Sequence, residues 1–273
     1  MSEFEIQGST LIRYKGSQAR VTVPDGITEL GESAFEDCGT PVEILLPQGL
    51  KKVGDWAFKG CTALEVLHMP DSVEEMGLNV FTDCPALKDV ALSHSLKTVE
   101  WGTFQDCTGL EEIDLPNNIT LIDFQAFSGC SKLKKVHLPD RLTELAPEAF
   151  RDCYRLEEVR LPVGLKKIGV SAFLNGFSLG PLYLPDGLGA IGDQAFLGCS
   201  KLTHFLAHPD TYGWAWAQKN ASVVEAQEKE EAPAPVSGVA SVAEELKALK
   251  ELLDLGVVTQ EEFDAKKKQL LGL

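Results

Sequence analysis

The chain has 273 residues, with 25 basic and 41 acidic side chains and a formal net charge of −16 at pH 7. It therefore lacks the basic stripe that nucleic acid binding requires. No stretch approaches the roughly 20 apolar residues of a membrane-spanning helix, and Met1 to Thr10 carries Glu3 and Glu5 where a secretion signal has basic residues and then an apolar run. We expect a cytoplasmic protein with no nucleic acid or membrane partner.

The first predicted element is a capping hairpin over residues 1–23. The outermost turn of a stacked structure exposes its core and an unpaired strand edge unless another segment covers them. Two glycines suited to tight turns separate three short stretches of weakly alternating hydrophobicity. The glycines are Gly8 and Gly16, and the stretches are Phe4 to Ile6, Leu11 to Tyr14 and Arg20 to Val23.

Residues 24–207 repeat with a period of 23 residues, without insertion or deletion. Phenylalanine recurs in all eight repeats, at Phe35, Phe58, Phe81, Phe104, Phe127, Phe150, Phe173 and Phe196. Proline opens seven repeats, at Pro24, Pro47, Pro70, Pro116, Pro139, Pro162 and Pro185, and Ser93 takes its place in the fourth. Such a period indicates a solenoid, whose stacked copies share a core that no single copy could bury.

Apolar positions that recur in the repeats mark the core. Two of them lie two residues apart just before the proline, as Leu67 and Met69 do, which predicts a short strand with one buried face. Two more lie three residues apart after the proline, as Val73 and Met76 do, which favours a tight helical or 3₁₀-like return. The sequence thus predicts eight rungs of short strands joined by irregular or 3₁₀ returns.

One motif runs through the repeats: Pro-Asp-Gly-Leu, then Ile-Gly, Ala-Phe, Cys and Leu. The last repeat carries it as Pro185, Asp186, Gly187, Leu188, Ile191, Gly192, Ala195, Phe196, Cys199 and Leu202. This pattern resembles the BspA-like branch of the leucine-rich repeat proteins, over residues 24–207. The resemblance implies a leucine-rich repeat solenoid of the α/β repeat class and a role in binding or adhesion.

Three further elements are predicted after the repeats. Residues 208–224 form a C-terminal cap, in which a short helix lays Trp214 and Trp216 over the last rung. Residues 225–241 are rich in Glu, Ala and Pro and lack an apolar face, which is typical of a flexible linker. Two Ser/Thr-x-x-Glu capping boxes, Ser241 to Glu244 and Thr259 to Glu262, are each followed by a periodic apolar run, which predicts a helical hairpin over residues 242–273.

This tail resembles the short C-terminal module called SHOCT. The resemblance rests on the run from Leu252 to Phe263, then Lys266-Lys267 and Leu270-Leu271-Gly272, and it implies a tail suspected of mediating association. A hairpin this small has to bury its apolar residues against something. We therefore expect homo-oligomers to form through the tail, with contacts from Leu246, Leu249, Leu253, Phe263 and Leu270.

All seven cysteines share one column of the repeat, with Gly176 in the remaining rung. Side chains in one ladder point in parallel, so we expect buried, reduced thiols rather than disulfides or metal ligands. The column from Asp37 to Gly198 holds only Asp, Asn and Gly. It could be a calcium ladder, but these residue types share a tolerance of positive φ, and we favour that explanation.

No metal site, cofactor or catalytic residue is predicted from the remaining motifs. His68 and His137 lie three rungs apart, about 14 Å by strand spacing, which is too far to bind one metal ion. His204 and His208 with Asp210 lie on an irregular cap and give only a weak zinc pattern. The sequence contains no phosphate-binding glycine loop, no Gly-x-Ser-x-Gly elbow and no Cys-x-x-Cys pair.

One candidate for a partner-binding surface is the outward face of the strands. Its residues vary in size, polarity and charge from rung to rung, which fits a binding face and equally fits unselected surface. The candidate residues there are His68, Asp114, His137, Arg160 and Tyr183.

A second candidate is the position after the repeat's glycine. It is acidic at both ends of the series but apolar in five consecutive rungs, at Leu78, Trp101, Phe124, Pro147 and Val170. These residues would form an apolar ridge about 20 Å long, widened by Leu121. Contiguous exposed apolar surface usually marks an interface. The alternative is that the aromatic rings fold back over irregular loops, or fill rungs where Glu100 and Asp123 replace the usual glycine.

We interpret the chain as a non-enzymatic protein interaction module or scaffold that binds a protein partner through one of these two surfaces. The alternative is a cell-surface adhesin of the BspA-like type, against which stand the missing secretion signal and the unpaired cysteines. An enzyme that uses surface carboxylates is a third class, which no motif supports.

Overall fold

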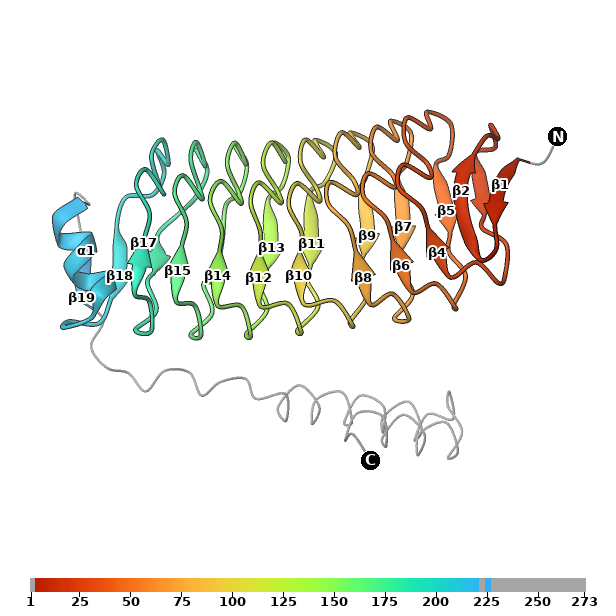
Figure 1. Cartoon of the computed structure of the whole chain (residues 1–273). Helices are drawn as coiled ribbons and strands as arrows, with labels where there is room; N and C mark the ends of the chain where they lie inside the picture. Colours follow the sequence, from red (N-terminus) through yellow and green to blue (C-terminus); the bar gives the residue numbers. More distant parts are fainter. Residues whose placement is uncertain (1–2, 221–223, 227–273) are drawn as a thin grey trace, which may run out of the picture. The chain divides into compact units, whose positions relative to one another are not determined.

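The computed structural model describes residues 3–220 and 224–226, which belong to one compact unit. This unit is a solenoid of about nine turns (Figure 1). Each turn of the solenoid consists of one 23-residue repeat, so residues that are 23 positions apart in the sequence lie side by side in neighbouring turns. Ile113, for example, lies opposite Val136 in parallel register. The predicted solenoid and its period are therefore confirmed.

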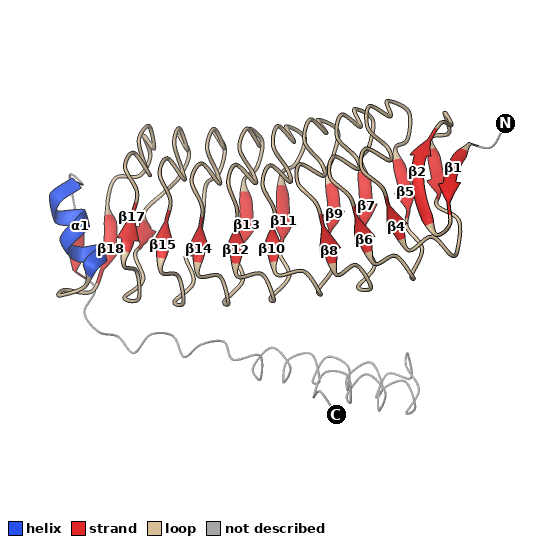
Figure 2. Ribbon diagram, in the orientation of Figure 1, coloured by secondary structure: helices blue, strands red, loops and turns tan. Residues whose placement is uncertain are grey.

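Most turns contribute short strands to two rows, and a face of turns closes the coil (Figure 2). The first row, which ends just before the proline position, contains β3 (Arg20–Thr22), β5 (Glu43–Leu45), β7 (Val66–His68), β9 (Asp89–Ala91), β11 (Glu112–Asp114), β13 (Lys135–His137), β16 (Leu182–Tyr183), β18 (Phe205–Ala207) and β19 (Val224–Ala226). The second row contains β4 (Glu29–Leu30), β6 (Lys52–Val53), β8 (Glu75–Met76), β10 (Thr98–Val99), β12 (Leu121–Ile122), β14 (Glu144–Leu145), β15 (Lys167–Ile168) and β17 (Ala190–Ile191).

The return after the proline is a single turn. Leu50 N donates to Pro47 O over 3.0 Å, an i to i+3 bond of the 3₁₀ type. The strand β6 then begins at Lys52. The predicted return is therefore only one turn long, and it leads into a second row of strands. The sequence pattern did not indicate this row, because a spacing of three also arises where a turn leads directly into a two-residue strand.

The turn face is held in left-handed backbone conformations. Every residue of the column from Asp37 to Gly198 has φ between 57° and 82°, as the preference for Asp, Asn and Gly predicted. Backbone N–H groups of each turn donate to carbonyls of the next, as Phe104 N does to Ala126 O over 2.7 Å. The turn face therefore has its own continuous hydrogen-bond ladder.

The phenylalanine column forms the centre of the core. From Phe35 to Phe196, successive ring centroids lie 5.1–5.5 Å apart, and the rings are nearly parallel. The stack continues at its N-terminal end to Tyr14, 5.2 Å from Phe35. At the other end, Trp216 meets Phe196 edge to face at 5.8 Å. Aromatic rings thus close the core at both ends.

The cysteine column forms a ladder of weak hydrogen bonds. Six of the seven thiols donate to the carbonyl of the phenylalanine 26 residues earlier over 3.1 Å, as Cys107 Sγ does to Phe81 O. All seven cysteines are free, and only Cys38 is half-buried rather than buried. Burial is thus confirmed for six of the seven thiols, and the structure adds a role for these six as weak donors.

Both rows of strands are interrupted between the third and fourth repeats, a place we call the central junction. Among the described strands, β8 does not pair with β10, and β9 does not pair with β11. The turn face continues across the junction, where Phe81 N donates to Thr103 O over 2.8 Å. The fourth repeat is also the one that departs from the pattern twice, with Ser93 in place of proline and Glu100 in place of glycine.

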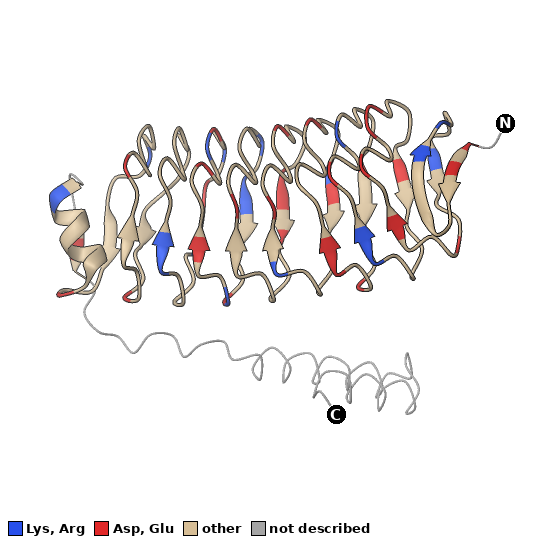
Figure 3. Cartoon of the chain, in the orientation of Figure 1, with Lys and Arg blue, Asp and Glu red and all other residues tan. Residues whose placement is uncertain are grey.

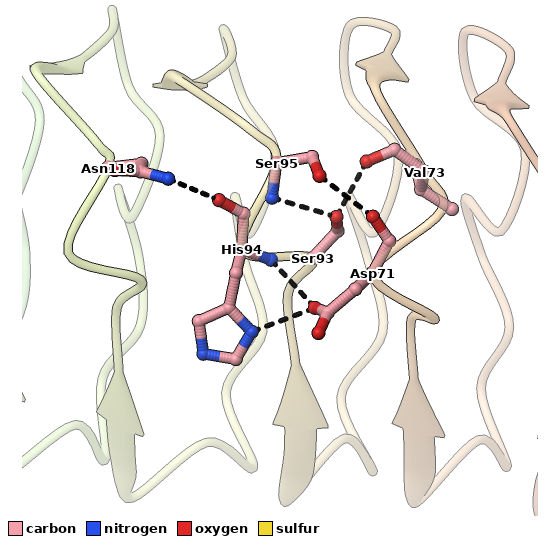
Figure 4. Close-up of polar contacts among 6 residues, drawn as sticks. All are labelled: Asp71, Val73, Ser93, His94, Ser95 and Asn118. Atoms are coloured by element: carbon pink, nitrogen blue, oxygen red, sulfur yellow. Dashed lines mark hydrogen bonds and ion pairs between the residues drawn. The ribbon is translucent and has the colours of Figure 1, made fainter. Parts of the chain in front are cut away.

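Side chains replace part of the missing ladder at the central junction (Figure 4). Ser93 Oγ donates to Val73 O over 2.6 Å, and His94 N donates to Asp71 Oδ1 over 3.1 Å. Asn118 Nδ2 of the fifth repeat donates to His94 O over 2.7 Å. A serine can therefore connect the third repeat to the fourth through its hydroxyl, which proline lacks.

The N-terminal cap is partly as predicted. β1 (Phe4–Gln7) and β2 (Thr10–Tyr14) pair antiparallel and form a hairpin, and β2 pairs in parallel with β4. β3, however, pairs in parallel with β5 and is the first strand of the first row. Residues 20–22 therefore belong to the repeat series and not to the cap over residues 1–23.

The C-terminal cap extends beyond its predicted end at residue 224. The helix α1 (Tyr212–Asn220) packs against β18, and β19 adds a further parallel strand, so the compact unit ends at Ala226. The rest of the linker over residues 225–241 and the hairpin over 242–273 lie outside the described residues. Within the described part, no helix has the length and hydropathy needed to cross a membrane.

The phenylalanine stack yields a first prediction. Phe104→Ala should lower the free energy of unfolding by about 3 to 5 kcal/mol, because it removes a fully buried ring from the middle of the stack. Cys107→Ser, in the same repeat, should cost less. Urea unfolding followed by circular dichroism measures both changes, and a Phe104→Ala protein as stable as the parent would contradict the central role of the stack.

The buried thiols predict a loss of stability in alkaline solution. Burial raises the pKa of Cys84 to about 12 and that of Cys199 to about 11, above the usual value of 9.0. The unfolded chain releases these protons first, so this contribution is complete at neutral pH and falls as the pH rises above about 8.5. The unfolding free energy should decline between about pH 8.5 and 10, and less steeply in Cys107→Ala. An unfolding free energy that stays constant over this pH range would contradict the burial of the thiols.

Candidate functional site

The strand-face candidates lie in the first row of strands. His68, Asp114 and His137 end β7, β11 and β13, and their side chains are exposed, as is that of Arg160. Tyr183 in β16 is half-buried. Four of the five side chains are therefore exposed as expected, and Tyr183, which lies between the buried Leu182 and Leu184, is partly covered.

Tyr183 belongs to the C-terminal end of the solenoid. Burial, together with the carboxylate of Asp186, raises the pKa of Tyr183 to about 12. His208 Nδ1 lies 2.7 Å from Asp186 Oδ1 and 3.3 Å from the Tyr183 hydroxyl. The three side chains form one cluster at this end, in which His208 is bonded to Asp186 and Tyr183.

The strand face is hollowed where its hydrogen-bond ladder is open. A hollow of about 460 Å³ lies between β9 and β11 at the central junction, and His68, Asp89, His94 and Asp114 are among its lining residues. His68 Nε2 lies 2.8 Å from Asp89 Oδ1. Two predicted residues, His68 and Asp114, are thus brought to one hollow.

A second hollow of about 320 Å³ lies beside β13, and it is lined in part by His137 and Arg160. Here the first row is reduced to a single bridge between Lys135 and Glu158. Four of the five strand-face candidates therefore line two neighbouring hollows at gaps in the ladder, and Tyr183 lines neither of them.

Among the described residues, one group of three side chains could offer ligands to a metal ion. The nearest ligand atoms of Glu112, Asp114 and His137 all lie within 4.8 Å of one another. All three side chains are exposed, and the His137 ring is hydrogen-bonded to Asp114. The sequence analysis missed this group because it paired His137 with His68 and left out the cross-strand carboxylates. Exposed groups of this kind are common without an ion, and we assign no metal to it.

The apolar ridge, defined by Leu78, Trp101, Phe124, Pro147 and Val170, follows the edge between the second row of strands and the turn face. Trp101 is 44% exposed and Val170 is 47% exposed, while the other three side chains are half-buried. The Trp101 and Phe124 rings meet edge to face at 5.6 Å. Phe124 therefore supports Trp101, whose ring remains open to solvent. Leu121 in β12 is half-buried beside them.

Trp56, whose backbone is bonded to that of the ridge residue Leu78, is a further exposed aromatic residue that was not predicted from the sequence. Its side chain is 37% exposed, and its backbone N donates to the carbonyl of Leu78 over 2.9 Å. Trp56 has φ of 55° in a column otherwise occupied by Ser, Asn, Gly, Gln and Glu. A large apolar residue at a left-handed position in a polar column was the feature that could have identified it.

Carboxylates surround the ridge. Asp55 Oδ1 accepts from Leu78 N over 2.8 Å, and Asp123 Oδ1 accepts from Phe124 N over 2.7 Å. Burial, and then the charge of Asp123, raises the pKa of Glu100, which precedes Trp101. A hollow of about 440 Å³ beside the ridge is lined by four acidic side chains and one lysine: Glu29, Glu32, Asp55, Glu75 and Lys52.

Charges elsewhere along the second row compensate one another. Figure 3 shows acidic and basic strands in alternation, such as β14 and β15. Lys167 Nζ lies 2.6 Å from Glu144 Oε1, and Lys52 Nζ lies 3.5 Å from Glu29 Oε1. Such exposed pairs contribute little stability. Asp55 and Asp123 differ from these pairs, because they accept from backbone N–H groups and form no ion pair with a cation of the described part of the chain.

The comparisons with known proteins agree with this geometry. The model of the BspA type leucine rich repeat region matches in six copies over residues 8–134 and 97–211, and the model of the short C-terminal domain, SHOCT, matches residues 244–271. The chain belongs to the BspA-type leucine-rich repeat family and carries a SHOCT module at its C-terminal end. No match was found among curated proteins.

Solved structures of bacterial leucine-rich repeat proteins share the fold. One from Bacteroides ovatus is 26% identical with a TM-score of 0.57, over 69% of this chain and 55% of that one. One from Eubacterium ventriosum is 25% identical with a TM-score of 0.58, over 62% and 46%. The T. pallidum leucine-rich repeat protein is 28% identical with a TM-score of 0.54, over 80% and 91%. The chain thus spans about half of the first two. The family suggests a protein-interaction or adhesin-like role.

Proposed function

We infer that the protein is a non-enzymatic interaction module that binds a partner protein through the apolar ridge. The observation that carries this proposal is the 44% exposure of Trp101 within a row of apolar side chains on five consecutive turns. Aromatic residues at the centre of a patch are where binding energy concentrates. The turn-face hydrogen bonds also hold these side chains on ordered turns, so binding does not require a loop to become ordered.

The carboxylates beside the ridge define the partner further. Asp55 and Asp123 flank it, and the chain as a whole carries a net charge of −16. A partner surface with an apolar centre and a rim of lysine and arginine is complementary to this arrangement. Rim charges of this kind accelerate association and weaken with salt.

The ridge proposal predicts that Trp101→Asp together with Phe124→Ser abolishes capture of the partner. Each aromatic anchor contributes about 2 kcal/mol, so the affinity should fall by two orders of magnitude or more. The measurement is quantitative mass spectrometry of proteins retained by the immobilised full chain. The melting temperature should change little, and a large drop would show that the two rings act in packing.

Matched variants separate the two candidate surfaces. Arg160→Glu changes the strand face, and Val163→Asp changes an exposed apolar residue outside both surfaces. A partner that binds the ridge should be retained by Arg160→Glu and by Val163→Asp, and it should be lost only from the double variant Trp101→Asp, Phe124→Ser. A protein that is lost from Arg160→Glu and retained by the ridge variant would refute the ridge and identify the strand face instead.

We place this activity in the cytoplasm. Seven free thiols, six of them buried, suit a reducing compartment. The alternative is an adhesin at the cell surface, in line with the adhesin-like role that the family suggests. Cell fractionation followed by immunoblotting distinguishes them: recovery of the protein in the surface fraction would contradict the cytoplasmic proposal.

The tail is proposed to join several chains. The sequence-based contact residues, Leu246, Leu249, Leu253, Phe263 and Leu270, lie outside the described residues, and the SHOCT match covers them. Assembly through the tail would raise the effective concentration of ridges toward a multivalent partner.

Light scattering tests the tail proposal on the full chain and on a chain ending at Ala226, where the compact unit ends. The full chain should have a multiple of the monomer mass, and the shortened chain should be monomeric. Equal, monomeric masses for both would refute self-association.

A further inference from the structure

The turn face of the eighth repeat carries three backbone N–H groups. In each of the seven earlier repeats, the equivalent N–H groups donate to carbonyls of the next repeat. From the seventh repeat to the eighth, these bonds are 2.8–2.9 Å long. The corresponding groups of the eighth repeat are the N–H groups of Gln194, Phe196 and Gly198. They have no acceptor in the part of the chain that the structure describes.

These donors border a cavity. A space of about 460 Å³ lies between the last turn and α1, and it is lined by residues 194–200, by Leu202, Thr203, His204 and Phe205, and by Trp216 and Asn220 of α1. The helix therefore covers the strands of the last turn but leaves its turn-face edge open. Phe196, Phe205 and Trp216 meet edge to face at 5.2–5.8 Å and give the cavity an aromatic wall.

The earlier turns define what such a row of donors recognises. In each of them, N–H groups at alternate positions of one turn bind carbonyls at alternate positions of one following segment, as Phe173 N binds Ala195 O over 2.8 Å. The ligand chemistry is therefore that of a polypeptide backbone that presents three carbonyls in sequence. This is the same principle by which an extended peptide adds to an open sheet edge.

A second copy of the solenoid cannot supply this segment by stacking its first turn on the last. Its N-terminal end is already covered by the hairpin of β1 and β2. There Tyr14 N donates to Ala34 O over 2.8 Å, and the Tyr14 ring lies on Phe35. The N-terminal end therefore lacks a free turn face that could add to the C-terminal end.

We propose that the cavity between the last turn and α1 binds a segment of a partner polypeptide, which pairs three alternate carbonyls with the N–H groups of Gln194, Phe196 and Gly198. An apolar side chain of that segment packs against the aromatic wall formed by Phe196, Phe205 and Trp216. This site lies at the end of the solenoid and is independent of the apolar ridge.

A synthetic peptide tests the proposal on the full chain. The probe is the capped octapeptide GVSAFLNG, which copies residues 169–176, a turn-face segment that contains no cysteine. The readout is amide hydrogen exchange by NMR. Without peptide, the amides of Gln194, Phe196 and Gly198 should exchange at least about tenfold faster than those of the seventh repeat. Saturating peptide should slow all three by about tenfold or more.

Two substitutions provide the controls. Thr203→Trp places a large ring in the cavity and should prevent the peptide from protecting the three amides. Lys201→Trp adds the same ring at an exposed position that does not line the cavity, and protection should persist. If the three amides are already protected without peptide, or if the peptide leaves their exchange unchanged, the proposal is refuted. Equal protection by inorganic phosphate alone would show an anion site instead and would also overturn it.

Discussion

The structure depends on exact stacking between successive turns. Each turn must present its backbone donors and its phenylalanine ring directly opposite the acceptors and the ring of its neighbour, because both interactions act over a single strand spacing. A one-residue insertion would move Phe104 out of line with Phe81 and Phe127 and would break the turn-face bonds at the same time. This is the physical reason for a period that stays at 23 residues through eight repeats.

Other features of the sequence follow from this stacking. Asp, Asn and Gly readily adopt a left-handed backbone, which fits their recurrence at the position of Asp37, although the left-handed column of Trp56 also holds Ser, Gln and Glu. A small side chain with a weak donor fits beside the phenylalanine carbonyl of the preceding turn, so cysteine recurs there. Neither column needs a metal or a redox role to explain it.

The repeats made much of the fold predictable. Phe104 and its equivalents could be placed in the core because eight copies agree at that position, and each copy acts as a control for the others. Features that depend on one copy alone were harder to predict. Trp56 and the group of Glu112 with His137 were missed, because their importance depends on which side chains lie beside them in neighbouring turns. In the sequence, the break in the two strand rows is marked only by the substitutions at Ser93 and Glu100.

The central junction has a mechanical consequence. Bending a regular solenoid across its strands requires its ladders to stretch, whereas here both rows are already open and only the turn face is continuous. The first three repeats and the last five are therefore joined by the turn face and by a few side-chain bonds, so a tilt between them would break no strand hydrogen bond. Leu78 lies in the third repeat and Trp101 in the fourth, on opposite sides of the central junction. A partner that contacts both residues would therefore fix the angle between the first three repeats and the last five.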